Sequence, residues 1–337
     1  MSADATVSPT RKARRVTAAM VAERAGVSVA TVSYVVNNNP NQTIPDATKE
    51  RVRAAVRDLG YTPSAAARAL RTGSNDAVLL MIPDWPATLA VAQLVDALTD
   101  EFTRIGLRLI TEREGASSPE VWRSLSPRAV LAFGDLEEDE RTAMTSAGIL
   151  VLESLVITGR HERESLFSQQ AVGVLQAEHL IGRGHHNIGY AAAAQEHLRP
   201  FSDLRLAGVV EACVRKEVAA PLQQRIAADG SNAIEALAAW LSASPRATAV
   251  AAFNDEVAAA LLAAARAQSV AVPGELAIIG VDDQPMSQFT EPPLTSARQN
   301  PSKMADHLAQ VVRSRLAGEP APALPHSVVE LIPRSST

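Results

Sequence analysis

The chain has 337 residues, of which 47% are hydrophobic, and a formal net charge of −5 from 32 Lys and Arg against 37 Asp and Glu. That length supports more than one compact domain. A single cysteine excludes an intramolecular disulfide and fits a reducing cytoplasm. Polar and charged residues interrupt the apolar runs, so neither a membrane span nor a secretory leader is expected.

Charge is distributed unevenly along the chain. Residues 1–73 hold eleven Lys and Arg against five Asp and Glu, a net +6, whereas residues 74–337 hold 21 against 32, a net −11. A basic segment on an acidic chain favours a nucleic-acid partner that binds through that segment. Residues 1–15 are expected to form a disordered basic arm, which is either a solvated tail or a source of additional phosphate contacts.

Two short helices are predicted within residues 17–37, TAAMVAERAGVSVATVSYVVN. Thr17 is placed to cap the first helix, Gly26 to end it with a positive φ, and Ser28 to cap the second. Helical spacing turns Val32, Val35 and Val36 inward. It turns outward a set consisting of Val29, Ala30, Ser33, Tyr34 and Asn37, with Thr31 on its flank. This is the layout of a helix-turn-helix, although an ordinary surface pair of helices has the same pattern.

A third helix is predicted over residues 44–60, ending at Gly60. Its Val52 and Val56 recur at helical spacing and can cover the first two helices. A short helix of small residues over 65–70 then leads into a Thr-Gly-Ser-Asn linker. Because a six-residue helix is marginal alone in water, we expect it to depend on a second copy of the chain or on DNA.

Beyond residue 76, apolar runs alternate with longer Ala-rich amphipathic stretches. This alternation predicts parallel sheets covered by helices on both faces, with ligands bound at the carboxyl ends of the strands. The predicted strands are 77–83, 107–111, 129–134, 149–154, 187–193, 223–229, 247–254 and 276–283. The predicted helices are 88–105, 170–183, 203–217, 232–243 and 255–269.

The run from Val16 to Gly73 resembles the headpiece of the lactose-repressor (LacI/GalR) family of bacterial transcription regulators. It carries the core VAxxAGVSxxTVSxVxN, a third helix ending in LGYxP, and the hinge AxxLRTG. The resemblance extends over about 16–334. It implies an all-α helix-turn-helix headpiece followed by a two-lobed α/β effector domain like a periplasmic binding protein, with parallel sheets flanked by helices.

The resemblance also implies the domain boundaries. The helix-turn-helix domain would occupy 16–62, the hinge helix and linker 63–75, and an effector-binding and dimerisation domain 76–337. Its first lobe would hold about 76–160 plus 298–320, and its second lobe about 161–297 plus 321–334.

In this family two headpieces bind a palindromic operator, and a hinge leucine, here Leu70, enters the minor groove. The family's base-reading positions fall on Val29, Ala30 and Tyr34. Many relatives have Arg where Tyr34 stands, so bidentate arginine–guanine contacts are not expected there. Val29 and Ala30 are expected to contact thymine methyls and Tyr34 to add a hydroxyl or edge contact, so that methyls and DNA shape are read more than guanine edges. The DNA-contacting set that the resemblance implies is Thr17, Ser28, Val29, Ala30, Thr31, Ser33, Tyr34, Asn37, Ala67 and Leu70.

The resemblance places a small-molecule site between the lobes. Arg205 matches an arginine that holds ligand hydroxyls or carboxylates, and a planar guanidinium suits that task. Asn254, Asp282 and Gln299 follow strands at the edge that faces the cleft. For Asn254 and Asp282 the alternative is helix capping or turn chemistry, since strand-to-helix junctions favour these residues.

Two departures from the family pattern weaken a sugar assignment. The sequence PDWPATLA stands where relatives run PDxxNPFF, so Trp85 is the aromatic side chain left to stack on a ligand, unless it packs in the core or an interface. Ser168 and Gln169 replace a family Asp-Asn pair. The expected ligand is therefore a small polar metabolite, a sugar, nucleoside or similar, with no cofactor or metal.

The function that these observations predict is a cytoplasmic, nucleoid-associated homodimer that regulates transcription, most simply as a repressor, under allosteric control. The ligand's identity, the sign of its effect, the operator sequence and the regulated genes stay open. The rival readings are a ligand-binding module without DNA function and an α/β enzyme. No catalytic motif was found for the second, so an enzyme is not expected.

Overall fold

The computed structural model describes residues 16–36, 43–61, 75–83, 88–113, 121–153, 155, 168–323, 325 and 328–337. The chain divides into two compact units, Met1–Asn75 and Asp76–Thr337, and each is described by itself. No single helix in these described ranges is long and apolar enough to cross a membrane. One sharply bent pair, Ala18–Ala25 and Val29–Val36, passes a test of length and composition, but it turns through 101°.

Three helices make up the described part of the first unit: α1 (Ala18–Ala25), α2 (Val29–Val36) and α3 (Asp46–Leu59). Thr17 accepts a hydrogen bond from the Met20 amide at 3.4 Å, and Gly26, with φ of 64°, ends α1. Val21, Val32 and Val52 come from the three helices and are buried together. The predicted inward face of α2 is therefore confirmed, and Val29, Ala30 and Tyr34 of the predicted outward face are exposed, while Asn37 lies outside the described residues.

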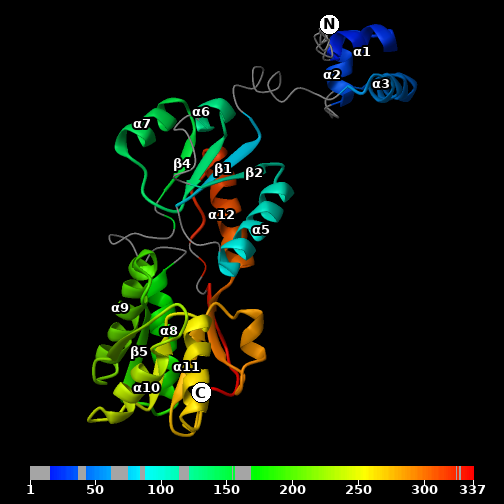
Figure 1. The fold of residues 1–337 in the computed structure, drawn as a ribbon. Helices are drawn as coiled ribbons and strands as arrows, with labels where there is room; N and C mark the ends of the chain where they lie inside the picture. The colour runs from blue at the N-terminus through cyan, green and yellow to red at the C-terminus, as the bar shows by residue number, and fades with distance from the viewer. Residues whose placement is uncertain are drawn as a thin grey trace, which may run out of the picture. The chain divides into compact units, whose positions relative to one another are not determined.

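The second unit contains two sheets (Figure 1). The first is parallel, in the order β2-β1-β3-β4, and it carries helices on both sides. α12 comes late in the chain, yet Figure 1 shows it beside α5, where Met304 and Leu308 pack with Leu98 and Phe102. The first lobe is formed by β1 (Ala77–Ile82), α5 (Leu89–Arg104), β2 (Arg108–Arg113), α6 (Val121–Leu125), β3 (Ala129–Ala132), α7 (Glu138–Ser146), β4 (Leu150–Leu152) and α12 (Pro301–Leu316).

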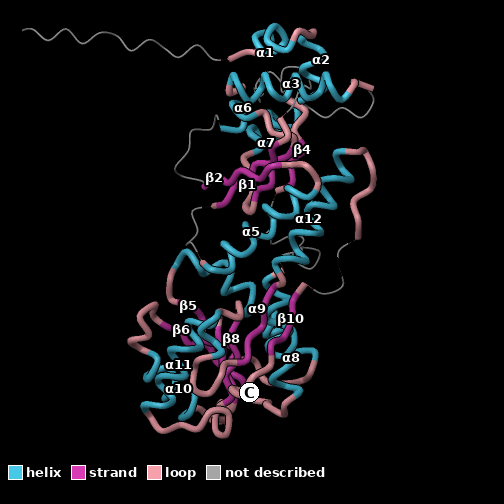
Figure 2. The backbone as a smooth tube through the Cα atoms, turned by 90° about the vertical axis from the view of Figure 1, so that its right-hand side faces the viewer, coloured by secondary structure: helices cyan, strands magenta, loops and turns pink. Residues whose placement is uncertain are grey.

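The second sheet has the order β10-β9-β8-β7-β5-β6, and β10 pairs antiparallel with β9 while the other strands run parallel. Figure 2 shows α8 and α9 on one side of these strands and α10 and α11 on the other. The second lobe is formed by α8 (Gln169–Gly182), β5 (Ile188–Ala193), η2 (Glu196–Leu198), α9 (Arg199–Arg215), β6 (Leu222–Ile226), α10 (Ala233–Ser242), β7 (Ala249–Ala252), α11 (Asp255–Ala267), β8 (Ala277–Val281), η3 (Pro285–Gln288), β9 (Thr295–Gln299) and β10 (Val329–Ile332).

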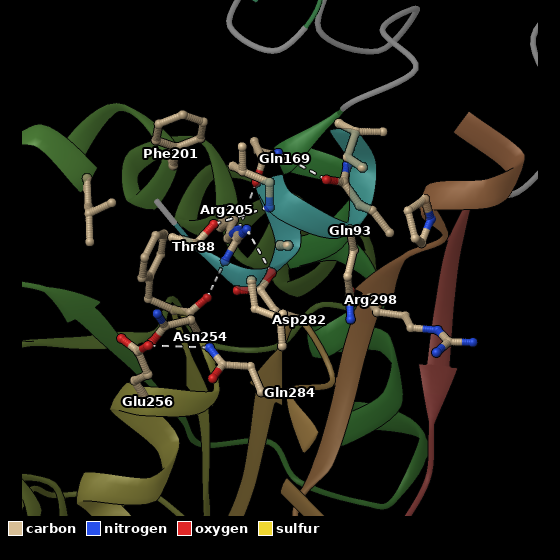
Figure 3. Close-up of a pocket in the computed structure, with 18 of the residues that line it drawn as sticks. Thr88, Gln93, Gln169, Phe201, Arg205, Asn254, Glu256, Asp282, Gln284 and Arg298 are labelled. Carbon is tan, nitrogen blue, oxygen red and sulfur yellow. Dashed lines mark hydrogen bonds and ion pairs between the residues drawn. The ribbon is translucent and has the colours of Figure 1, made fainter. Parts of the chain in front are cut away.

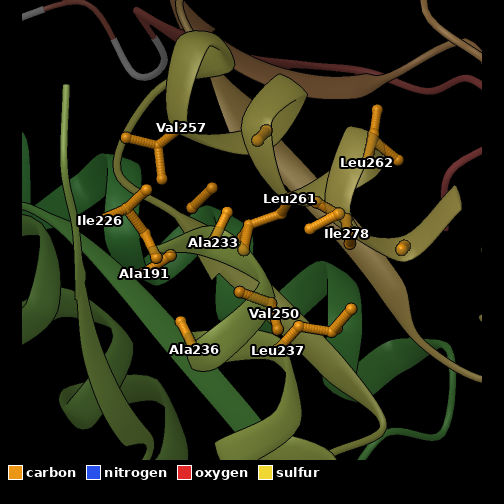
Figure 4. Close-up of a cluster of buried hydrophobic side chains, with 14 of the residues drawn as sticks. Ala191, Ile226, Ala233, Ala236, Leu237, Val250, Val257, Leu261, Leu262 and Ile278 are labelled. Atoms are coloured by element: carbon orange, nitrogen blue, oxygen red, sulfur yellow. The ribbon is translucent and has the colours of Figure 1, made fainter. Parts of the chain in front are cut away.

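Both faces of the second sheet are buried, which explains its continuous apolar strands. On one face Val250 and Ile278 pack against Leu237 of α10 and Leu261 of α11 (Figure 4). On the other face the neighbouring residues Ala251 and Ile279 pack against α8 and α9. Cys213 of α9 is buried in that second cluster, where it packs as a small apolar side chain.

The predicted fold class is confirmed, and each of the eight predicted strands overlaps an observed one. β9 and β10 were not among them. β9 reads TSARQ, and its Thr295 and Ser296 are buried because their hydroxyls are hydrogen bonded, so the strand has no apolar run to detect. The predicted helix 203–217 begins earlier, at Arg199, because Pro200 is favourable in a first helical turn.

Candidate DNA-reading surface and effector pocket

The start of α2 presents a mostly apolar surface. Ser28 accepts a hydrogen bond from the Thr31 amide at 3.1 Å, and the two hydroxyls lie 2.9 Å apart. Val29 is 49% exposed and Tyr34 37%, although both are large hydrophobic side chains that are usually covered. Ala30 is also exposed, and Ser33 is half-buried on the same outward side of the helix. This surface offers methyl groups and hydroxyls, not cations.

Among the described residues of the first unit, the cations lie on α1 and α3. Arg51 and Arg57 are exposed, and Lys49 pairs with Asp46 at 3.0 Å. Arg24 pairs with Asp58 at 3.5 Å through side chains that are both more than half exposed. Exposed pairs of this kind contribute little stability, so these cations can exchange a carboxylate for a phosphate. Asn37, Ala67 and Leu70 lie outside the described residues.

A cavity of about 400 Å³ lies within the second unit, lined by residues of both lobes. The first lobe contributes the N-terminal turns of α5 and α12 and Phe133. The second contributes the ends of β7, β8 and β9 and the start of α8, α9 and α11. Figure 3 labels ten of the lining side chains: Thr88, Gln93, Gln169, Phe201, Arg205, Asn254, Glu256, Asp282, Gln284 and Arg298.

Arg205 lies at the centre of the cavity's polar wall, two turns into α9, and is 7% exposed. Its Nε donates to Oε1 of Gln169 at 2.9 Å, and a terminal nitrogen donates to the Phe253 carbonyl. The other terminal nitrogen lies 3.7 Å from the carboxylate of Asp282. The guanidinium also lies over the Phe253 ring, 4.6 Å from its centroid. Its fork is therefore held in one orientation before any ligand binds.

Asp282 ends β8 with a φ of 96°, a backbone conformation that L-residues rarely adopt. Burial raises the pKa of its carboxyl, while the positive charge of Arg205 acts in the opposite direction. Strain of this kind concentrates at sites whose geometry is fixed by function. Asp282 does not cap a helix, but it lies at a bend after β8, in agreement with the turn chemistry that the sequence left as an alternative.

For Asn254 the capping alternative holds: its Oδ1 accepts from the Val257 amide at 2.9 Å at the start of α11. Its side chain also lines the cavity. Gln299 lines the same cavity, and its Oε1 accepts from Gln169 at 3.3 Å. The structure thus gathers Arg205, Asn254, Asp282 and Gln299 around one space, whereas Trp85 lies outside the described residues.

Several lining residues were not predicted from the sequence as ligand contacts. They are mostly amides and charged groups that follow strands or begin helices: Gln93, Gln169, Gln195, Glu256, Gln284 and Arg298. Position 169 had been noted as a departure from the family pattern. The rule that ligands bind at the carboxyl ends of parallel strands would have found Glu256 and Gln284, which follow β7 and β8 closely.

A buried carboxylate supports the floor of the cavity. Asp255 is fully buried and accepts from the hydroxyls of Ser287 at 2.6 Å and Ser296 at 2.7 Å and from the Gln284 amide at 2.7 Å. Burial raises the pKa of Asp255 to about 6, although these hydrogen bonds act to lower it. A Cβ at Gly280 would lie 2.1 Å from this carboxylate, so only glycine fits there.

Two glycines position the wall that carries Arg205. A Cβ at Gly173 of α8 would lie 1.8 Å from the Arg205 carbonyl oxygen, and one at Gly208 of α9 would lie 2.0 Å from the Gln170 carbonyl oxygen. The two helices therefore touch backbone to backbone beside the cavity. Among the described residues no group of three or more His, Cys, Asp or Glu is arranged to hold a metal ion.

Comparison with known proteins agrees with both units. Residues 17–64 match the family described as bacterial regulatory proteins, lacI family, and residues 177–337 match a periplasmic binding protein-like domain. The GalR regulator of Salmonella typhimurium strain SL1344 is 30% identical over 318 residues, covering 91% of each chain. A PurR repressor of Mannheimia succiniciproducens is 26% identical over 314 residues, covering 89% of this chain and 92% of its own.

Solved structures show the same fold. The Lac repressor dimer bound to operator and the anti-inducer ONPF superimposes with a TM-score of 0.76 at 22% identity, covering 96% of this chain and 99% of that one. The complex of the regulator CelR with cellobiose superimposes with a TM-score of 0.60 at 25% identity, covering 96% of this chain and 100% of that one. With a relative at 30% identity over nearly its whole length, the chain belongs to the LacI family of DNA-binding bacterial transcriptional regulators.

Proposed function

We propose that this regulator is a repressor whose affinity for a palindromic operator is controlled by a small polar metabolite bound in the cavity between the two lobes. The observation that carries this proposal is the cavity itself, about 400 Å³, where Arg205 is held in place by Asp282 and Gln169. Pockets of this size with a few convergent polar groups are the usual sites of small ligands.

The DNA-binding half of the proposal rests on α2. Two headpieces of a homodimer would each place Val29, Ala30 and Tyr34 against base edges in a major groove. The exposed cations of α1 and α3 would hold the phosphates. The relatives named above support this assembly, since the Lac repressor structure is of a dimer on its operator. Such a regulator works in the cytoplasm, at the nucleoid, and performs no catalysis.

A polar network supplies a route from the cavity to the segments that join the lobes. Arg298 lines the cavity and donates to Oε2 of Glu330 at 3.3 Å. Oε1 of Glu330 accepts from Asn300 at 3.0 Å and from Lys303 of α12 at 2.8 Å. The hydrogen bonds from Lys303 and Asn300 lower the pKa of Glu330, so the carboxylate stays charged. A ligand that moves Arg298 therefore acts on a contact between β10 and the first lobe.

The sign of the response follows from which state the ligand binds better, because an effector strengthens the state for which it has the higher affinity. An inducer favours the conformation with weak operator affinity, and a co-repressor favours the other.

The test combines ligand binding and DNA binding on the full chain. Sugars, nucleosides and amino acids are screened by thermal shift, and each hit is added to a gel shift on the DNA upstream of the chain's own gene. Arg205→Lys and Asp282→Asn should lose the thermal shift and the change in operator affinity, while still binding the operator. Arg266→Ala, an exposed arginine on α11 outside the cavity, is the matched control.

Three outcomes oppose the proposal. Hits whose affinity is unchanged in both variants place the effector elsewhere, and hits that bind without altering operator affinity remove the regulatory role. Failure of the full chain to bind the operator better than residues 74–337 do would favour a ligand-binding module without DNA function.

A further inference from the structure

Both arginines that line the cavity are already matched by carboxylates. Arg205 faces Asp282 at 3.7 Å. Arg298 faces Asp283 at 3.2 Å and Glu330 at 3.3 Å. These carboxylates have further cations behind them, because Arg334 lies 2.6 Å from Asp283 and Lys303 lies 2.8 Å from Glu330. Each arginine at the wall is therefore already paired with at least one carboxylate, and neither is available to an anion without breaking an ion pair.

Two hydrogen-bond acceptors elsewhere in the cavity, Gln195 and Glu256, have no strong donor. The Oε1 atom of Gln195 is buried with no hydrogen-bond partner in the structure. Glu256 is exposed to the cavity, has no cation within 4.0 Å among the described residues, and accepts only a long hydrogen bond of 3.4 Å from Gln284. Both also line a small annex of about 20 Å³, next to Asn254 and Leu198. That space holds one water molecule or one ligand hydroxyl.

From these contacts we infer that the effector carries no anionic group and presents hydroxyl or amide hydrogen-bond donors to Gln195 and Glu256. This inference rests on the proposed function and names the class of ligand for that site.

The physical reason is the cost of burying an unpaired charge. A phosphate or carboxylate in this cavity would exchange water for a wall whose arginines are already ion-paired and whose unpaired carboxylate, Glu256, repels it. A hydroxyl both donates and accepts, so it suits the amides of Gln93, Gln195 and Gln284, which do the same. Phe201 and Leu198 supply an apolar surface for the carbon skeleton.

The experiment measures binding of each probe to the full chain by calorimetry. DNA is left out, because the counter-ions of the charged probes would weaken an operator complex. Probes are used in matched sets: D-glucose, D-glucose 6-phosphate and D-gluconate; D-galactose, D-galactose 6-phosphate and D-galactonate; adenosine and AMP; and inorganic phosphate alone. In any set that binds, the uncharged member should bind at least about tenfold more tightly than its anionic counterpart. The sugar and nucleoside sets distinguish the two sources of hydroxyl groups.

Two variants test the cause. Asp282→Asn leaves Arg205 without its counter-charge and should allow inorganic phosphate to bind where the wild type does not. Glu256→Gln should reduce the preference for the uncharged member of a set several-fold. Glu235→Gln, the same change at an exposed position of α10 outside the cavity, should leave that preference unchanged.

An anionic probe that binds as tightly as its uncharged counterpart, or phosphate bound by the wild type in competition with it, overturns the inference and leaves the proposed function standing. A chain that binds no probe of any set removes the cavity as an effector site, and the inference falls with it. If Asp282→Asn still binds no phosphate and Glu256→Gln keeps the selectivity of the wild type, charge at the wall is not what selects the ligand.

Discussion

The headpiece and the effector unit encode their sites in opposite ways. The proposed DNA-reading surface of the headpiece lies on one eight-residue helix, α2, and each outward side chain of that helix is fixed by helical periodicity and one cap. The effector cavity is lined by residues between Thr88 and Met304, which meet only because two sheets place their strand ends at one space. Local patterns therefore reveal the first site, whereas the second depends on packing between segments far apart in the sequence.

If packing places the effector site, changes in packing should have the largest effect on it. Gly208→Ala puts a methyl group against a backbone carbonyl of α8, which cannot move aside. We expect a loss of about 3 kcal/mol in the free energy of unfolding of the effector unit. Urea denaturation measures it, and ligand binding should weaken because α9 carries Arg205.

The matched control is Gly182→Ala, at the end of α8, where a Cβ meets nothing within 4 Å. It should be neutral or stabilise by up to about 1 kcal/mol, since alanine favours helices. Equal destabilisation by both variants would mean that close α8–α9 contact does not position the wall.

The next largest effect concerns the buried carboxylate below the cavity. Asp255→Ala leaves two hydroxyls and the Gln284 amide without their acceptor and should cost about 2 kcal/mol. Asp255→Asn keeps one oxygen for Ser287 and Gln284, while its NH₂ can donate to Ser296, so it should be nearly neutral at pH 7.

The pH dependence has a definite sign. The folded-state pKa of Asp255, about 6, lies above its usual value of 3.8, so the fold binds this proton more tightly than the unfolded chain does. The contribution of this bound proton to the free energy of unfolding is fully present below pH 3.8 and is lost as the pH rises through 6. Thermal unfolding between pH 4 and 7 should therefore show Asp255→Asn gaining relative to wild type as the pH rises. A constant difference would contradict the raised pKa.

A smaller effect is expected in the headpiece, where a single local contact is removed. Ser28→Ala deletes the side-chain acceptor for the Thr31 amide at the start of α2 and should cost about 1 kcal/mol of headpiece stability. Ser28→Asp should restore most of it, because an aspartate accepts the same bond. Circular dichroism of the full chain during thermal unfolding resolves the headpiece transition, and a loss that aspartate does not rescue would point to a different role for Ser28.

The features that could be predicted from the sequence are the local ones. The helical hairpin, the cap at Ser28 and eight strands could be predicted because each depends on neighbours in the chain. Arg205 and Asp282 could be placed by resemblance. Their ion pair, the buried Gln169 between Arg205 and Gln299, and the hydrogen bonds of Asp255 could not, since the partners lie from 29 to 130 residues apart in the sequence. β9 was missed because its buried residues are polar and satisfied by distant groups.

The smallest expected effect tests what the apolar start of α2 reads. A thymine differs from a uracil in DNA only by the C5 methyl group that it shows in the major groove. If Val29 and Ala30 contact such methyls, replacing one contacted thymine by deoxyuridine should weaken operator binding by about 0.8 kcal/mol, roughly fourfold. Fluorescence anisotropy on operators substituted one thymine at a time measures this.

Two variants test the cause. In Val29→Ser the difference in affinity between the thymine and deoxyuridine operators should shrink, because the valine methyls are gone. Arg51→Ala removes a proposed phosphate contact and should weaken binding to all operators alike. Deoxyuridine operators that bind wild type as well as thymine operators would show that this helix recognises the shape of the groove, and that Tyr34 and not Val29 carries what base contact there is.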